Sequence, residues 1–378
     1  MRYHNIARQS AATIALLAAM SAFSSVANAT VVVDSLSNEP LPRASVFDCN
    51  GNMTATCSDD GTLPVVKSDK YPLTVRYLGY MPATLAHTGE DTVRMSALRY
   101  ELPEIVIDTQ SHNILHLKGY MREYTSMTRS SDTVQLFSEK IVDFMLPTEK
   151  NKKFKGWKSP RTLAERNFYR FTDSADLDSV SSLNSNHFQW FDFVDIFSKN
   201  IKIPETLRDN SAKADTVAGK YGVKILWNKL SDRYIFETDM LADKKDHKWS
   251  PNFLKFFGLT TDFTRLSTKY TFTEPDGSDI SPAEITMATF DIEALCRGKL
   301  YKWVSGSDEP FNIRSYYEFY VTDKEYLTPD DAKDWKEHPE TKGITVTVPD
   351  GVPELEPAIV RLIERVGEER LLCLLSCR

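Results

Sequence analysis

Apolar and polar positions are arranged differently in the first hundred residues and in the remainder of the chain. Between residues 30 and 108, short apolar runs are separated by turn-forming Asp, Asn, Gly and Pro residues, which predicts an all-β sandwich. Leu73, Val75 and Tyr77 alternate with their neighbours, as in a strand with one buried face. The expected strands are residues 31–33, 44–47, 62–66, 73–77 and 105–107.

From residue 112 to the end, longer apolar runs predict a larger α+β domain built on an antiparallel sheet. Residues 115–124 and 134–145 read as long neighbouring strands joined through the polar turn 129–132, although a helix is an alternative for the second. The pattern as a whole favours an antiparallel meander. Further strands are expected at residues 223–227, 234–239, 269–273, 285–292, 300–304, 316–321 and 344–348.

Capping residues predict three helices in this second region. Ser250-Pro251 opens a short helix that Gly258 ends, and Thr328 is an N-cap followed by Pro329. Pro357 begins a C-terminal helix with an apolar stripe. We expect this stripe to cover a sheet, with contact to a membrane surface as the alternative. The stripe consists of Ile359, Leu362, Ile363, Val366, Leu371, Leu372, Leu374 and Leu375.

Residues 1–29 have the features of a secretory signal peptide. Arg2 and Arg8 precede the apolar stretch 11–23, which is too short to span a bilayer as a mature helix. The small residues of Ala27-Asn28-Ala29 suit a signal peptidase. We therefore expect export, with no transmembrane span downstream, because no later run approaches 18 apolar residues.

Composition narrows the class of protein further. The 378 residues carry 46 Lys and Arg against 53 Asp and Glu, a net charge of −7. A general nucleic-acid binder needs a basic surface to neutralise phosphates, so nucleic acid is not an expected partner. The 41% hydrophobic content is ample for a sizeable core in a chain of this length.

Five landmarks in the first region resemble one known family. They are a Val-rich strand ending in Asp at residues 32–34, EPLPRASV at 39–46, SDDGTL at 58–63, VRYLGY at 75–80 and LPEIVI at 102–107. In this order they resemble the carboxypeptidase regulatory-like domain, a small transthyretin-like β-sandwich. Two departures are a missing Gly ahead of the first Val and Leu63 where the family has an aromatic residue.

The resemblance implies a location and a domain type. Similar domains precede outer-membrane transporters and other envelope modules of Gram-negative bacteria, so a periplasmic or outer-membrane-associated protein is expected. The name of the carboxypeptidase regulatory-like family also suggests a zinc site, for which His87 and Glu90 are the candidates. These two residues lie within the strands and loops of the sandwich itself, whereas the zinc site of such peptidases belongs to a separate catalytic domain. We expect no zinc carboxypeptidase site, and no metal or cofactor.

Export makes the five cysteines relevant, because disulfides persist outside the cytosol. Cys49 and Cys57 flank the turn Asn50-Gly51-Asn52, so a bridge between them is possible. Cys373 and Cys377 are four residues apart on the terminal helix, a spacing that favours apolar packing.

Two stretches could contact a ligand. Residues 150–158 gather five lysines around two aromatic residues, and Lys153, Lys155 and Trp157 could hold an anionic glycan or lipid head group. A solvated loop is the alternative. The aromatic stretch 188–197 is expected to form core, with a binding platform as the alternative.

Catalytic motifs are missing from the sequence, which contains no Gly-x-Ser-x-Gly, Walker loop, His-Glu-x-x-His or Cys-x-x-Cys. His112 and His116 would be about 13 Å apart on a strand, too far to share a metal. The acids at 173, 176 and 178 lack the Gly of an EF-type calcium loop. Glu237 and Asp239 form a carboxylate pair on one strand face that chance explains.

These observations favour an exported, non-enzymatic binding or assembly module of the cell envelope, with an envelope or outer-membrane protein as its partner. Two alternatives are a glycan-directed hydrolase and a lipid or lipoprotein carrier. Acids clustered in an apolar cleft would favour the hydrolase, and an apolar cavity inside the sheet would favour the carrier.

Overall fold

The computed structural model describes most of the chain after residue 28. The described ranges are residues 29–100, 113–147, 154–175, 177–183, 190–191, 194–219, 224–230, 233–256, 258–273, 277–302, 306–339 and 343–376, with side chains described up to residue 369. The signal-peptide region, the predicted strand 105–107 and the joint 108–111 lie outside these ranges.

The N-terminal region is a small β-sandwich, as the sequence predicts. A four-stranded sheet in the order β3-β2-β4-β5 packs with a parallel pair, β1 and β6. Leu41, Val46 and Val75 are fully or almost fully buried between them. The strands are β1 (Val31–Asp34), β2 (Ser45–Phe47), β3 (Met53–Thr56), β4 (Leu73–Arg76), β5 (Ala83–Leu85) and β6 (Thr92–Met95), with a short 3-10 helix η1 (Ser68–Lys70).

The second region contains one antiparallel sheet of ten strands in the order β10-β9-β8-β7-β18-β17-β15-β14-β13-β12. Two meanders meet where β7 pairs with β18. The strands are β7 (Ile114–Thr128), β8 (Asp132–Pro147), β9 (Trp157–Asp173), β10 (Asp178–Ser181), β12 (Ala214–Ala218), β13 (Lys224–Lys229), β14 (Arg233–Asp239), β15 (Thr260–Thr273), β17 (Ile285–Arg297) and β18 (Phe311–Leu327).

Shorter elements connect these strands. A separate antiparallel pair is formed by β11 (Ile201–Lys202) and β16 (Asp279–Ile280). The α-helices are α2 (Glu205–Arg208), α3 (Asn252–Phe256), α5 (Pro329–Glu337) and α6 (Pro357–Ser376), and the 3-10 helices are η3 (Lys245–His247), η4 (Pro282–Glu284) and η5 (Lys299–Tyr301).

Most predicted elements are confirmed, but three predicted strands and one alternative are not. Residues 134–145 belong to strand β8, so the helix alternative is wrong. Residues 62–66 form only a single bridge, between Thr62 and Val31. Residues 344–348 were expected to be a strand but pair with no strand of the described ranges, and Val346 packs against a hydrophobic cluster that includes Tyr120 and Tyr320. Residues 299–301 form η5 instead of the start of a strand.

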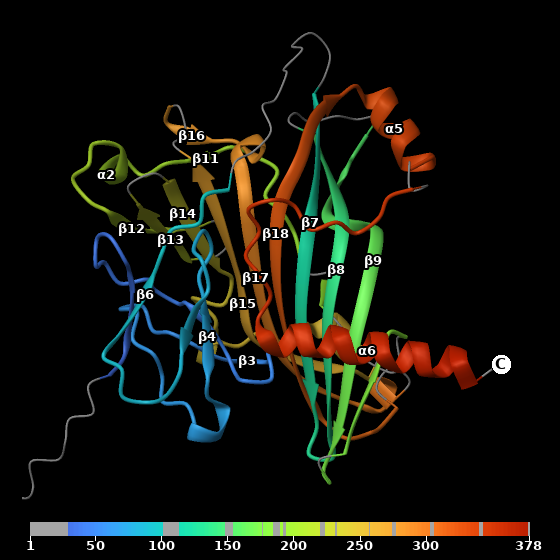
Figure 1. The fold of residues 1–378 in the computed structure, drawn as a ribbon. Helices are drawn as coiled ribbons and strands as arrows, with labels where there is room; N and C mark the ends of the chain where they lie inside the picture. The colour runs from blue at the N-terminus through green and yellow to red at the C-terminus, as the bar shows by residue number, and fades with distance from the viewer. Residues whose placement is uncertain are drawn as a thin grey trace, which may run out of the picture.

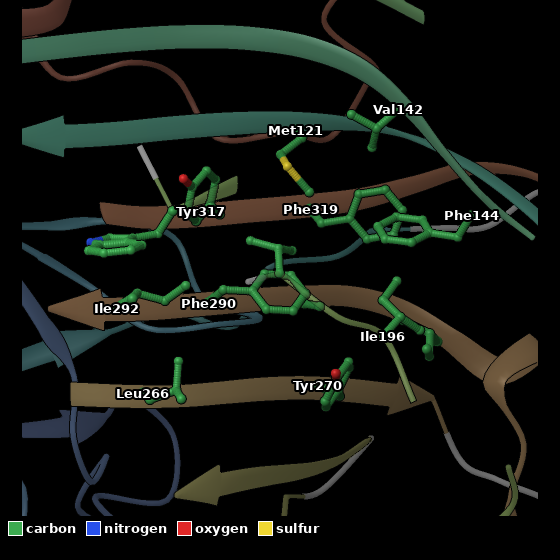
Figure 2. Packing of buried hydrophobic residues seen from close by; sticks show 14 of the residues in the cluster. Met121, Val142, Phe144, Ile196, Leu266, Tyr270, Phe290, Ile292, Tyr317 and Phe319 are labelled. Atoms are coloured by element: carbon green, nitrogen blue, oxygen red, sulfur yellow. The ribbon is translucent and has the colours of Figure 1, made fainter. Parts of the chain in front are cut away.

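One face of the large sheet, which we call the apolar face, carries the main hydrophobic core. Figure 2 shows Met121, Phe144, Phe290 and Phe319 side by side on neighbouring strands. Within this face Glu123 and Lys140 form a buried ion pair at 3.0 Å. The chain's own segment 190–207 covers the face with Trp190, Val194, Ile196, Ile203 and Leu207. Its described part confirms that the aromatic stretch 188–197 contributes core.

The opposite face, which we call the charged face, carries the residues at the alternate positions of the same strands. Arg122, Asp143, Asp291, Arg314 and Glu318 are buried there. The sandwich covers one part of this face and α6 lies across β7, β8 and β9 (Figure 1). Ile359, Leu362 and Val366 of α6 pack into the sheet, which confirms that the described part of its stripe covers a sheet.

Candidate binding groove

A groove of about 690 Å³ runs between the sandwich and the segment that leads into α6. Its floor and one wall come from β4, β5 and the residues after β6, and its other wall is the segment 351–356 with Pro357 at the start of α6. The groove is lined by Thr74, Met81, Pro82, Thr84, Ala97, Leu98, Arg99, Gly351, Val352, Pro353, Glu354, Leu355, Glu356 and Pro357.

Strand β5 forms an edge of this groove. It is the last strand of its sheet and pairs on one side with β4. Successive residues of an antiparallel strand direct their backbone groups to opposite sides. The Cys57 N–H donates to the backbone oxygen of Ala44. By alternation, Val46 therefore bonds toward β3 and Phe47 bonds toward Thr74 of β4. Leu73 and Val75 then bond toward β5. The N–H and C=O of Thr84 therefore point away from β4, and the Thr84 side chain is exposed.

The side chains along the groove are mainly apolar, with charges of both signs. Met81 is 41% exposed, and Leu98 is buried. Val352 and Leu355 on the opposite wall are half-buried, while Arg99 and Glu354 are exposed. The groove thus offers apolar contacts along its length and one charge of each sign at its surface.

A buried ion-pair cluster fixes the wall formed by residues 351–357. Arg76 of β4 donates to both carboxylate oxygens of Glu318 at 2.7 and 2.8 Å and also binds Glu356. Its guanidinium lies 5.2 Å from the ring centre of Tyr124. Burial alone would lower the pKa of Arg76, but the two carboxylates outweigh it and raise that pKa well above its ordinary value. This residue remains charged and ties the sandwich, β18 and the groove wall together.

Two further contacts position the sandwich and the wall. Arg122 of β7 donates to the backbone oxygen of Pro353 at 2.7 Å. Arg43 of the sandwich binds Glu237 and Asp239 of β14 at 3.2 and 3.3 Å. The carboxylate pair that the sequence places on one strand face is therefore engaged by a half-buried arginine.

A second polar cluster lies on the charged face near α5. His116 is fully buried, with Nδ1 2.9 Å from Glu325 and Nε2 3.0 Å from Asp143. Trp335 of α5 donates to Asp143 at 2.7 Å. Burial would raise the pKa of Asp143, but hydrogen bonds from His116, Arg161 and Trp335 outweigh it and lower that pKa. The cluster joins α5 to the sheet.

The predicted ligand-contact residues are placed apart from the groove. Lys153 lies outside the described residues, and Lys155 is exposed. Trp157 is half-buried and turned inward, because its Nε1 donates to Asp143 and Arg161 stacks 4.2 Å from its ring centre. The structure therefore does not bring Lys155 and Trp157 together on one open surface, and a ligand role for these residues stays a prediction.

Cys49 and Cys57 are free thiols in the structure. The Cys49 thiol donates to the Asp69 backbone oxygen at 3.7 Å, while Cys57 is buried in the sandwich core. Burial raises the pKa of the Cys57 thiol to about 12. The predicted bridge stays a prediction that a mass measurement of the exported protein can test.

The acids and histidines singled out for metal binding have other surroundings. His87 is exposed, with its Nδ1 3.8 Å from Glu90. Asp173 caps a turn by accepting from the backbone of Ala175 and Leu177. Over the described ranges, no group of three or more His, Cys, Asp or Glu side chains is arranged to hold a metal ion.

The groove is not predicted by any motif of the sequence. Thr84 and Arg76 carry no motif, and the residues that meet across the groove are separated by more than 200 positions in the chain. The available signals were the Pro-rich extended segment 349–357 and a Pro at position 82 next to a short strand. Neither signal indicates which distant segment lies opposite.

Comparisons with known proteins provide no family. No protein-family model matches the chain, and no curated protein matches it. Among solved structures, a lipovitellin structure concerned with lipid–protein interactions is 9% identical, with 58% of this chain and 26% of that chain covered and a TM-score of 0.28. A putative AttH from Nitrosomonas europaea is 8% identical, with 60% of each chain covered and a TM-score of 0.16.

Both TM-scores are too low to support an argument about fold or function. The chain spans about a quarter of the length of the lipovitellin chain. The resemblance of residues 30–108 to the carboxypeptidase regulatory-like domain therefore stays a proposal. Within the described part of the chain, no helix is long and apolar enough to cross a membrane.

Proposed function

We propose that this protein is an exported binding or assembly module of the cell envelope, which takes an extended polypeptide segment of its partner into the groove beside β5. The observation that carries the proposal is that Thr84, a residue of the edge strand β5, lines the groove. An extended peptide can pair with such an edge as an added strand.

The composition of the groove favours a peptide over a small polar ligand. Backbone pairing with Thr84 would provide affinity independent of sequence, while alternate side chains of the peptide would face Met81, Leu98 or Val352. Arg99 and Glu354 add charges of opposite sign that would favour one peptide direction and sequence over others. The groove is lined by residues from several segments, so it offers several contacts instead of one pocket.

The groove is preorganised, which lowers the cost of binding. Arg122 holds Pro353 and Arg76 holds Glu356, so one wall is fixed by buried hydrogen bonds. The opposite wall belongs to a sheet with its own core. A partner would therefore order its own segment without reordering this one.

The envelope location rests on the sequence. The signal-peptide features of residues 1–29 indicate export, and the resemblance of the sandwich implies an envelope module. Two observations do not favour the alternative functions, a glycan-directed hydrolase and a lipid carrier. Arg43 already engages Glu237 and Asp239, and the chain's own segment 190–207 covers the apolar face.

Site-specific photo-crosslinking in Gram-negative cells tests the proposal. A photoreactive amino acid at Thr84 should give a discrete crosslinked product whose partner segment mass spectrometry can identify. Thr216 is the matched control, because it is also an exposed Thr on an edge strand, β12. It should not give that product.

Three outcomes count against the groove. They are no discrete product at Thr84, the same product at Thr216, or a product with lipid or glycan instead of a polypeptide. Competition with a synthetic copy of the captured segment should remove the crosslink at Thr84. If the crosslink persists in excess peptide, the captured segment is a chance neighbour.

A further inference from the structure

A second concavity lies at the start of α6, away from the groove wall of residues 351–356. It has a volume of about 230 Å³ and is lined by Asn50, Gln135, Arg170, Arg361 and Arg365, with Cys49, Ala358 and Leu362 completing it. At ~30 Å³ per water, this volume corresponds to roughly eight water molecules. Its size suits a small ligand or head group and not an extended chain.

Three guanidinium groups surround this cleft. Arg361 and Arg365 lie one turn apart on α6, and Arg170 lies on β9. Arg170 and Arg365 share one carboxylate, Asp178, at 2.8 and 2.6 Å. The hydrogen bonds from Arg365, which have the largest effect, and from Arg170 lower the pKa of Asp178 to about 2. This carboxylate is therefore ionised at neutral pH.

The charge in the cleft is not balanced by this one acid. Arg361 is exposed and forms no ion pair among the described side chains. Glu368 and Glu369 act on Arg365 from the next turn of the helix, and do not line the cleft. Two like charges four residues apart on a helix repel each other, and the cleft faces the positive end of the α6 dipole through Ala358.

We propose that the arginine cleft binds a phosphate-type dianion, as free phosphate or as the head group of a phosphomonoester lipid. The planar guanidinium of arginine matches two oxygens of such a group at once. Arg361 supplies an unshared fork, while Arg170 and Arg365 supply charge from groups already fixed by Asp178. The amide of Gln135 is held by the backbone oxygen of Asn50 at 2.7 Å and shapes the opposite side.

Isothermal titration of the mature chain with inorganic phosphate, at constant ionic strength, measures the binding directly. Saturable binding is expected, and Arg361→Gln should weaken it by about tenfold, as loss of one charge-assisted contact implies. Arg208→Gln is the matched control, because Arg208 is an exposed arginine on α2, far from α6 in Figure 1. This control should bind phosphate like the wild type.

Co-sedimentation with phosphatidylcholine vesicles, with and without phosphatidic acid, distinguishes the source of the anion. Sedimentation that needs phosphatidic acid and falls in Arg361→Gln supports a lipid head group, and phosphate binding without sedimentation supports a free anion. The proposal is overturned if neither probe binds, or if Arg361→Gln and Arg208→Gln bind equally. Urea unfolding of both variants checks that each is folded.

Discussion

The two faces of the large sheet are buried by different chemistry. The apolar face is filled by side chains such as Phe290 and Phe319 and is closed by the chain's own segment 190–207. The charged face buries Arg122, Glu318 and their neighbours against the sandwich and α6. Apolar packing is non-directional, whereas a buried ion pair is satisfied in few geometries. The charged face therefore determines where the sandwich sits and how the groove is formed.

The apolar face contributes mainly to stability, and the charged face also sets the geometry of the groove. The apolar face has a continuous core and no role in shaping the groove. Arg76, in contrast, contacts β18 and the groove wall together. Substitutions on the two faces should thus have different effects on the fold and on binding.

The largest effect on stability is expected on the apolar face. Phe290→Ala removes a ring that is 1% exposed, so it should lower the free energy of unfolding by about 3–5 kcal/mol through lost transfer energy and a cavity. Urea unfolding measures this effect. Phe253→Ala is the matched control, because that ring is 59% exposed and its removal should cost under about 1 kcal/mol. A similar loss in both variants would contradict the assignment of the core.

A loss of comparable or smaller size is expected at the charged face. Arg76→Ala leaves Glu318 and Glu356 buried without their cation, which should cost about 3 kcal/mol or more. Arg94→Ala is the control, because this arginine of the same sandwich is exposed, and it should cost about 0.5 kcal/mol or less. Urea unfolding gives both values.

Arg76→Ala should also impair binding beyond its effect on folding, because Glu356 belongs to the groove wall. Folded Phe290→Ala protein should keep the affinity of the wild type for the captured peptide. Titration of the peptide into each folded variant makes this comparison. Equal affinities for the two variants would show that the ion-pair cluster does not shape the groove.

A smaller and pH-dependent effect is expected at the His116 cluster. The hydrogen bond from His116, with Lys118 nearby, lowers the pKa of Glu325 from 4.5 to about 2. A carboxylate with a lowered folded-state pKa stabilises the fold fully above its unfolded pKa, and this stabilisation is lost as the pH falls. The wild type should therefore lose stability between about pH 4.5 and 2 more steeply than Glu325→Gln.

Unfolding curves over that pH range provide the measurement. Glu337→Gln is the control, because this exposed acid on α5 lies 4.0 Å from Lys333 and contacts no buried group among the described residues. Its stability should follow the wild-type curve. If the free energy of unfolding of Glu325→Gln changes with pH in parallel with that of the wild type, Glu325 does not contribute pH-dependent stability.

Local patterns predicted the elements where each element depends on its own residues. Apolar runs over residues 115–124 and 134–145, joined by the polar turn 129–132, predict β7 and β8, and Thr328 with Pro329 predicts the start of α5. Residues 344–348 show where this reasoning stops. Their apolar alternation is that of a strand, but a strand also needs a neighbour to pair with.

The groove could not be predicted for the same reason. Its parts are the edge of a three-residue strand and a segment about 270 residues later in the chain. Arg76 is a polar position of an alternating strand, and its pattern does not indicate its partners Glu318 and Glu356, which lie 242 and 280 residues away. The chain encodes these contacts through tertiary packing, which a single sequence does not display.

Hydrogen exchange at the amide of Thr84 shows whether a peptide pairs with the outer edge of β5. The captured partner segment, added as a synthetic peptide, should slow exchange at Thr84 and leave the amide of Thr216 unchanged. Thr84→Pro removes the Thr84 N–H donor at an edge position where proline is tolerated, so it should lower the affinity for the peptide by about tenfold or more. Peptide binding without protection at Thr84, or with full affinity for Thr84→Pro, would contradict the account.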